Sequence, residues 1–190
     1  MTLARVKNIE EELVRKIACG DEKAYRDLFH LYYRRLCRFA FLILQSQELS
    51  EEAVADVFFN VWMKRDRLRS ERNIRSFLYT SVRNQAINYI QRMNPQQPME
   101  NINVYELEIA AAEPSVDETM DNELFHQRLQ HAFDELPERC RMIARLHFSD
   151  QLPSKEIAKI LAIAPKTVNA QIAIATQKIK ALFEKHRWNK

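Results

Sequence analysis

The sequence predicts an all-α protein made of two small helical domains joined by a flexible acidic linker. The 190 residues include one Gly and six Pro, and apolar residues recur with the 3.6-residue period of amphipathic helices over long stretches. This pattern stops once, at 93–120, where three Pro and six acidic residues occur without any Lys or Arg. Such a composition is typical of a flexible connection. We therefore expect domains at 1–92 and 121–190, with 93–120 as the linker.

The net charge of +3 conceals a strong division along the chain. Residues 1–92 carry a net +5, residues 93–138 carry −10, and residues 139–190 carry +8. Two basic ends around an acidic middle indicate contact with a polyanion at both ends. Because basic surface is common in proteins, the charge alone does not decide whether the partner is nucleic acid.

Composition excludes several classes of protein. Gly20 is the single Gly, whereas phosphate-binding and dinucleotide-binding loops need several glycines close together. The longest apolar run, 39–44, is too short to span a membrane, and the start of the chain lacks the apolar core of a signal peptide. We therefore expect a cytoplasmic protein. Cys19, Cys37 and Cys140 are widely spaced and predict neither disulfides nor a metal site, and we expect no cofactor.

Four helices are expected in the first domain, at about 10–19, 22–44, 50–65 and 74–92. Gly20 is expected to end the first helix and Asp21 to cap the second. Ser50, followed by two Glu, predicts the start of the third helix through a side-chain cap and an acidic first turn. A polar and basic connection, 66–73, leads into the fourth helix.

In the second domain, helical spacing resumes near Asp121 and pauses at the Leu136-Pro137 pair. It continues through Leu146, and two further helices follow Pro153, the second beginning at Pro165. Their apolar positions have the spacing by which two short helices pack across a tight turn. These positions are Ile157, Leu161, Ile163, Val168 and Ile172. The pattern predicts a helix-turn-helix; the alternative is an ordinary helical hairpin.

Two residues depart from the usual helix-turn-helix pattern. Ala162 occupies the turn position usually given to Gly, where a left-handed conformation costs an L-residue about 1–2 kcal/mol. Ala164 replaces the usual Ser or Thr cap, a loss of about 1 kcal/mol. Pro165 at the first helical position partly compensates because its φ is fixed.

The second helix of this motif is expected to turn a weakly polar face outward. That face comprises Lys166, Thr167, Asn169, Ala170, Ala173 and Ile174. Asn can read adenine and Ala can contact a thymine methyl group, whereas no Arg is present to read guanine. We therefore expect a weak, A·T-leaning readout, with Lys155 and Lys166 holding phosphates.

A second candidate nucleic-acid surface lies at 64–92, where cations and aromatics alternate. Its cations are Lys64, Arg65, Arg67, Arg69, Arg72, Arg75, Arg83 and Arg92. Single-stranded nucleic acid is bound by such combinations of charge and rings. The aromatics Phe77, Tyr79 and Tyr89 are better explained as core residues. Asn84 and Asn88, one helical turn apart, can each pair with a base edge or serve only the fold.

Five strings in this order resemble the extracytoplasmic-function (ECF) sigma factors, the two-domain promoter-specificity subunits of bacterial RNA polymerase. The strings are GDEKAYRDLF (20–29), DVFFNVW (56–62), NIRSFLYTSVRNQAINYI (73–90), LPERCR (136–141) and SKEIAKILAIAPKTV (154–168). The resemblance covers about 8–92 and 121–185. It implies a non-enzymatic initiation factor that binds core RNA polymerase, through its β and β′ subunits, and promoter DNA.

The resemblance also implies which residues meet the polymerase. The helix at 50–65 would dock on a coiled coil of the β′ subunit, with Glu52, Asp56 and Asn60 as polymerase-binding residues. Phe58 and Trp62 would be core residues that support this face. Ala55 stands where the family usually has Gln.

Two sets of DNA-binding residues follow from the resemblance. For the melted −10 element they are Lys64, Arg65, Arg67, Arg69, Arg72, Asn73, Arg75, Asn84, Asn88 and Arg92. For the −35 duplex they are Ser154, Lys155, Lys166, Thr167, Asn169, Ala170, Ala173 and Ile174. The connection at 66–73 would capture a flipped −10 base, and Phe77 replaces the usual Trp.

The acidic linker and a further partner are also implied by the family. The linker would thread through the basic active-site cleft and RNA exit channel of the polymerase, whereas a solvated spacer predicts the same composition. An anti-sigma factor, often membrane-anchored in this family, would hold the protein inactive.

Two other functions compete with this one. A stand-alone helix-turn-helix regulator would explain 121–190 but gives the basic stretch at 64–92 no purpose. A helical enzyme would have to use Glu51, Glu52 and Asp56, which no His, Cys or second acidic cluster accompanies at ligand spacing.

Overall fold

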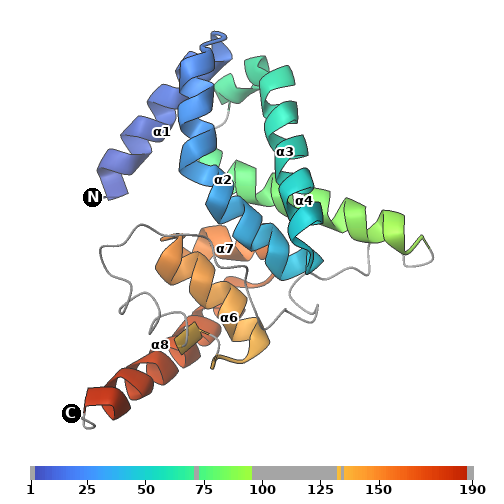
Figure 1. Cartoon of the computed structure of the whole chain (residues 1–190). Helices are drawn as coiled ribbons and strands as arrows, with labels where there is room; N and C mark the ends of the chain where they lie inside the picture. Colours follow the sequence, from blue (N-terminus) through green and yellow to red (C-terminus); the bar gives the residue numbers. More distant parts are fainter. Residues whose placement is uncertain (1–2, 71–72, 96–131, 134, 188–190) are drawn as a thin grey trace. The chain divides into compact units, whose positions relative to one another are not determined.

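The structure of the chain is a computed structural model that describes residues 3–70, 73–95, 132–133 and 135–187 (Figure 1). These residues form helices and short connections without any strand, which confirms the all-α prediction. The chain divides into two compact units, Met1–Ile102 and Asn103–Lys190. Most of the predicted linker, and the start of the helix expected near Asp121, lie outside the described residues.

The first unit is built around one long central helix. Its elements are α1 (Leu3–Ala18), α2 (Glu22–Leu44), α3 (Gln47–Met63), the 3-10 helix η1 (Arg65–Ser70) and α4 (Ile74–Met93). Helix α2 contacts α1, α3 and α4, so that its side chains form the middle of the core (Figure 1). The largest fully buried side chains of this unit include Leu28, Tyr32, Leu36, Leu42, Phe58, Leu78 and Tyr79. This burial supplies most of the driving force that holds the four α-helices together.

Two of the predicted helix ends are confirmed. Gly20 has a φ of +87°, which ends α1, and the Asp21 side chain caps α2 by accepting a hydrogen bond from the Ala24 amide at 3.0 Å. Helix α1 nevertheless begins at Leu3, seven residues before the predicted start.

The predicted start of the third helix is wrong. Ser46, in extended conformation, caps α3 through a 3.4 Å bond from the Leu49 amide. Ser50 lies one turn inside the helix, where its hydroxyl is buried and donates to the Ser46 carbonyl at 2.6 Å. Because Gln45 ends α2 in the left-handed conformation, the chain turns earlier than the acidic pair after Ser50 suggested.

The second unit contains four described elements. They are α6 (Glu138–Ala144), the π-helical turn η4 (Arg145–Ser149), α7 (Ser154–Leu161) and α8 (Pro165–Arg187). Pro137 directly precedes α6, which confirms the pause predicted there. A core cluster joins the segment before α6, α6 itself and α8, and it consists of Phe133, Leu136, Cys140, Ala144 and Ala175, with Ile179 packed against it.

Helices α7 and α8 have the geometry of a helix-turn-helix. The first 17 residues of α8, Pro165–Ala181, bend by 116° from α7, within the range of about 90–120° that is typical of this motif. Ile157, Leu161 and Val168 are buried between the helices. Ala162 adopts the left-handed conformation with a φ of 56°. The turn therefore keeps the usual backbone shape although it lacks the usual Gly.

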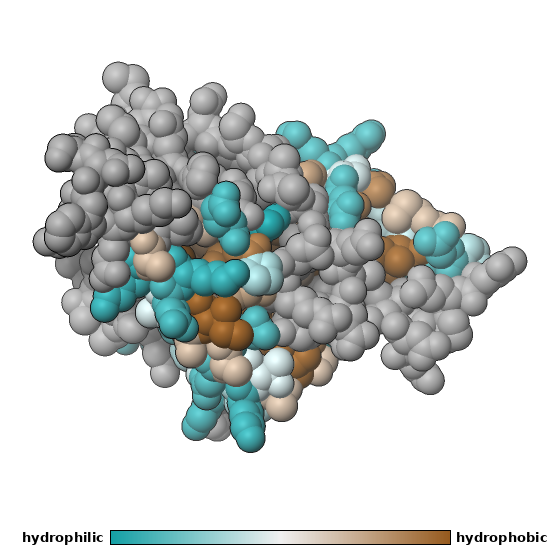
Figure 2. Space-filling model, turned by 90° about the horizontal axis from the view of Figure 1, so that it is seen from below, coloured by the Kyte–Doolittle hydropathy of each residue, from teal (hydrophilic) through white to brown (hydrophobic). Residues whose placement is uncertain are grey.

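Among the described residues, few large apolar side chains are exposed, and only Phe59 and Met63 lie one helical turn apart. On the face shown in Figure 2, the described residues present small hydrophobic areas between hydrophilic side chains. Among the described residues, the exposed large hydrophobics are Ile9, Leu31, Phe59, Met63, Met93, Phe148 and Ile174. None of the described helices is by itself long and apolar enough to cross a membrane, and α7 with α8 meets that criterion only as a bent pair.

The strain at Ala162 leads to a stability prediction. Ala162→Gly should raise the free energy of unfolding of the second unit by about 1 kcal/mol, because Gly adopts this φ without the steric cost that Ala carries. Ala158→Gly, inside α7, is the control and should lower it by about 1 kcal/mol. Chemical denaturation measures both, and an unchanged or lower stability for Ala162→Gly would show that the turn is not strained.

Candidate functional site

The outward face of α3 differs from the face that the sequence predicted. Glu52 and Asn60 are exposed, as expected, and Asp56 is half-buried. Phe59 and Met63, which the sequence reasoning left out, are 62% and 59% exposed. Positions 52, 56, 59 and 63 follow one another at the spacing that places residues on one side of a helix. We call Glu52, Asp56, Phe59, Asn60 and Met63 the α3 face.

Burial on the opposite side of α3 explains why two large apolar residues remain outside. Val54, Val57, Phe58 and Val61 fill the stripe that packs into the core. Residues 57–63 are apolar at every position but one, and a single helical stripe cannot hold them all. More apolar residues occur in this run than one side of a helix can bury, and this excess could have identified Phe59 and Met63 from the sequence.

Asp56 joins α3 to α4 as well as contributing to the α3 face. Its Oδ2 atom accepts hydrogen bonds from Gln85 Nε2 at 2.8 Å and from the Tyr89 hydroxyl at 3.1 Å. Burial, together with this bond to a carboxylate, raises the pKa of Tyr89 to about 12. Replacing Asp56 would therefore disturb the packing of α3 against α4 as well as any contact with a partner.

An aromatic cleft lies beside the α3 face, between α2 and α3. It has a volume of about 440 Å³ and is lined by Glu22, Tyr25, Arg26, Phe29, Phe59 and Trp62. The Tyr25 and Trp62 rings lie 5.0 Å apart, and the Tyr25 hydroxyl donates to the Phe58 carbonyl at 2.9 Å. Phe58 is a core residue, as predicted, whereas Trp62 is only half-buried and forms a wall of the cleft.

The basic residues that follow α3 are held in different ways. Lys64, Arg67 and Arg92 are exposed. The Arg65 guanidinium lies 4.9 Å from the centre of the Trp62 ring and donates to the Trp62 carbonyl at 3.1 Å. Arg72 and the side chain of Arg69 lie outside the described residues.

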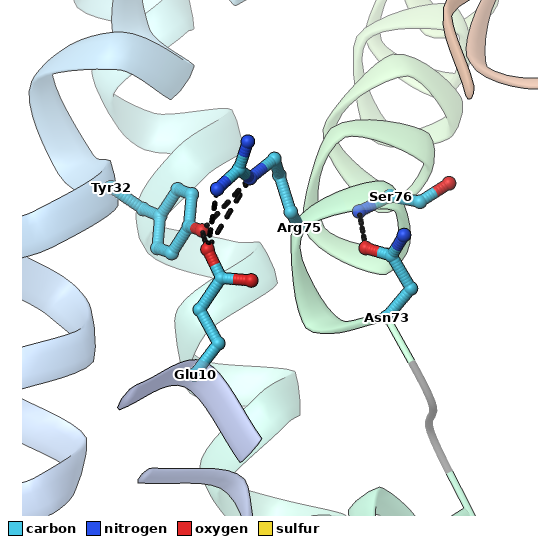
Figure 3. A network of polar contacts seen from close by, with 5 residues as sticks. All are labelled: Glu10, Tyr32, Asn73, Arg75 and Ser76. Carbon is cyan, nitrogen blue, oxygen red and sulfur yellow. Dashed lines mark hydrogen bonds and ion pairs between the residues drawn. The ribbon is translucent and has the colours of Figure 1, made fainter. Parts of the chain in front are cut away.

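Arg75 does not belong to the exposed basic set. Its side chain is 11% exposed, and its Nη2 atom lies 2.8 Å from Glu10 Oε1 (Figure 3). Its Nε atom donates to Glu10 Oε1 and to the Tyr32 hydroxyl, both at 3.3 Å. The assignment of Arg75 to DNA is therefore corrected. The regular spacing of cations in the sequence did not reveal that Arg75 pairs with a buried carboxylate, Glu10, on α1.

The polar residues of α4 also divide between structural and outward positions. Asn73 caps α4, with its Oδ1 atom accepting from the Ser76 amide at 2.9 Å (Figure 3). Asn84 is exposed and accepts a 3.3 Å bond from Arg83. Asn88 is half-buried.

The aromatics of α4 are mainly core residues. Tyr79 is fully buried with its ring 5.2 Å from that of Phe39, and Tyr89 is 8% exposed. Phe77 is half-buried. A core role for these rings, rather than a row of stacking platforms, is supported for Tyr79 and Tyr89.

The face that α7 and α8 turn outward contains the predicted −35 set. Lys155, Lys166, Asn169, Ala170 and Ala173 are exposed, and Ile174 is 41% exposed. Ser154 and Thr167 are half-buried. The two lysines lie near the starts of the two helices, one residue after Ser154 and one after Pro165. Among the described residues, no group of three or more His, Cys, Asp or Glu could hold a metal ion.

Comparisons with known proteins match both units to one kind of protein. Residues 28–94 match the family model of Sigma-70 region 2, and residues 126–179 match that of Sigma-70 region 4. The chain is 22% identical over 166 residues to the ECF RNA polymerase sigma factor SigW of Bacillus subtilis (strain 168), covering 84% of this chain and 88% of that protein. The chain belongs to the ECF sigma factor family.

A solved structure has a fold similar to that of the chain. The structure of CnrH in complex with the cytosolic domain of CnrY is similar to the chain with a TM-score of 0.54 and 17% identity, over 93% of this chain and 98% of CnrH. The two family models, together with the likeness to SigW, support a sigma factor for transcription initiation that contains regions 2 and 4.

Proposed function

We propose that this sigma factor binds core RNA polymerase through the α3 face and directs it to promoters with two DNA-binding surfaces. The outward residues of α8 would contact the −35 duplex. The basic segment after α3, together with Asn84 and Asn88, would hold the melted −10 strand. The observation that carries the proposal is the exposure of Phe59 and Met63 on the same face of α3 as Glu52, in a unit that matches region 2.

The chemistry of the α3 face suits a protein partner. Phe59 and Met63 lie one helical turn apart and are each near 60% exposed, and neighbouring exposed apolar side chains are typical of interaction sites. Aromatic residues flanked by polar ones are the usual energetic centres of interfaces, while charges at the rim steer association. Phe59 would supply the buried centre, and Glu52 the charge that attracts a basic surface of the β′ subunit. The β subunit would be contacted elsewhere on the sigma factor.

Replacing the aromatic side chain tests the docking surface. Phe59→Ala should weaken binding to core polymerase roughly 30-fold, because it removes the apolar centre of the interface. Met93→Ala is the matched control, since Met93 is similarly exposed, at 53%, but lies at the end of α4. Fluorescence anisotropy with labelled sigma factor measures both affinities. Equal affinities for Phe59→Ala and the unmodified chain would remove the α3 face from the proposal.

An exposed amide on α4 tests the −10 surface. Asn84→Ala should slow promoter opening about tenfold while leaving core binding intact, because a side chain that pairs with a base edge contributes about 1–3 kcal/mol. Asn94→Ala, at the exposed C-cap of the same helix, should change neither property. Permanganate reactivity of unpaired thymines in the −10 region reports opening. Unchanged opening on every cognate promoter would contradict the assignment.

We propose that recognition of the −35 element depends more on phosphate contacts, which position α8 on the duplex, than on contacts with bases. Lys155 and Lys166 would hold phosphates and set the register of α8 on the duplex. Asn169, Ala170 and Ala173 would then meet base edges, favouring A·T pairs. Because several of these side chains are small, region 4 alone should bind DNA weakly, and binding should strengthen when core polymerase adds its own contacts.

An inhibitory partner and the linker complete the proposal. CnrH is solved in complex with the cytosolic domain of CnrY, and this supports an anti-sigma factor for the present chain, in a form whose membrane anchor leaves a cytoplasmic segment to bind. The acidic linker at 93–120 would follow the basic channel of the polymerase between the two domains. The protein would act in the cytoplasm, where polymerase and promoter DNA occur.

A further inference from the structure

We propose that Glu10, on α1, is a positioning residue for capture of the −10 strand. Through Arg75 it would fix the end of α4 at which the basic connection from α3 enters that helix. This inference rests on the −10 function proposed above for that connection. Glu10 precedes the segment that matches region 2, which begins at residue 28.

The geometry joins three helices at one buried point. Glu10 is 6% exposed and Tyr32, on α2, is 1% exposed. Arg75 on α4 forms an ion pair with Glu10 at 2.8 Å, and the Tyr32 hydroxyl donates a further hydrogen bond to the same carboxylate oxygen (Figure 3). A buried ion pair is stabilised when further hydrogen bonds satisfy its charged groups, and such a pair fixes the positions of the side chains that form it.

This point lies next to the start of α4. Arg75 is the second residue of α4, and it follows Asn73, which caps the helix through the Ser76 amide (Figure 3). Glu10 therefore holds the same turn that the cap organises. In Figure 3 the Asn73 and Ser76 side chains lie on the other side of that turn from Glu10.

The other end of the connection is also held against α1. Leu68, in η1, is 2% exposed, and η1 packs against α1. Described residues on both sides of this connection, Leu68 in η1 and Arg75 in α4, are thus held against the same helix, α1. Catching an unstacked base requires a backbone that is already in place, because ordering a loop during binding would reduce the affinity.

The position of Glu10 separates this role from polymerase docking. The α3 face is supported by the bonds of Asp56 to Gln85 and Tyr89, which lie about three and four helical turns farther along α4 than Arg75. Loss of the Glu10 carboxylate should therefore alter the start of α4 and spare the α3 face. A purely structural role would instead weaken docking and opening together.

The test uses the full chain with core polymerase, and it compares a variant of the Glu10–Arg75 pair with a control variant on the same helix. Glu10→Gln leaves the Arg75 guanidinium without its carboxylate, and it should slow promoter opening about tenfold with core affinity retained. Glu12→Gln is the matched control, since Glu12 is exposed on the same helix and pairs with Lys16 at 2.7 Å. Such exposed pairs contribute little, so neither property should change by more than about twofold.

A double variant keeps the inference falsifiable if Glu10→Gln is poorly folded. Glu10→Gln combined with Arg75→Met removes both charges, and a buried pair can be replaced by neutral residues without loss of stability. Positioning predicts that the double variant regains the thermal unfolding midpoint of the unmodified chain while opening stays slow. Recovery of opening together with stability would overturn the proposal, as would normal opening by a folded Glu10→Gln variant.

The same assay separates this inference from the proposed function. If the unmodified chain opens promoters and Asn84→Ala does not, while Glu10→Gln opens them normally, the positioning role alone fails. If the unmodified chain with core polymerase opens no promoter, the proposed −10 function fails first, and the role of Glu10 that rests on it fails too.

Discussion

The packing of α3 against α2 and α4 is the constraint from which the proposed docking surface follows. Four apolar residues of α3, from Val54 to Val61, fill the stripe that the core accepts. The helical period then leaves Phe59 and Met63, in the last turns of α3, on the same outward face as Glu52 nearer its start. The Asp56 contacts with α4 fix the rotation of α3 about its axis. A helix rotated by one position would bury Phe59 and expose Phe58, and the outward surface would be lost.

In the second unit, backbone geometry plays the corresponding part. The left-handed Ala162 sets the bend of 116° between α7 and the first part of α8, and buried Val168 sets the rotation of α8. The predicted −35 residues on the outward face of α7 and α8 are mostly small and carry no charge apart from Lys155 and Lys166. A DNA-binding helix with such a face depends on phosphate contacts to fix its register on the duplex. This fits a factor whose specificity is expressed when a larger enzyme holds it on the promoter.

Much of the fold could be predicted from the sequence because it depends on local chemistry. Gly20 and Asp21 mark a helix boundary by their own conformational preferences. Ser46 was missed because Ser50 has the same chemistry and a more acidic sequence after it, and only the end of α2 decides between them. The role of Arg75 could not be predicted, since its partner Glu10 is 65 residues away and nothing local distinguishes it from its exposed neighbours.

Dependence on polymerase is the central claim, and a mobility-shift experiment with a promoter fragment tests it most directly. The chain alone, core polymerase alone and the two together are each added to the same fragment, and run-off transcription is measured in parallel. The account predicts a promoter-specific complex and a specific transcript only when both proteins are present. A tight, specific shift by the chain alone, with no polymerase-dependent transcript, would contradict it and identify a stand-alone regulator.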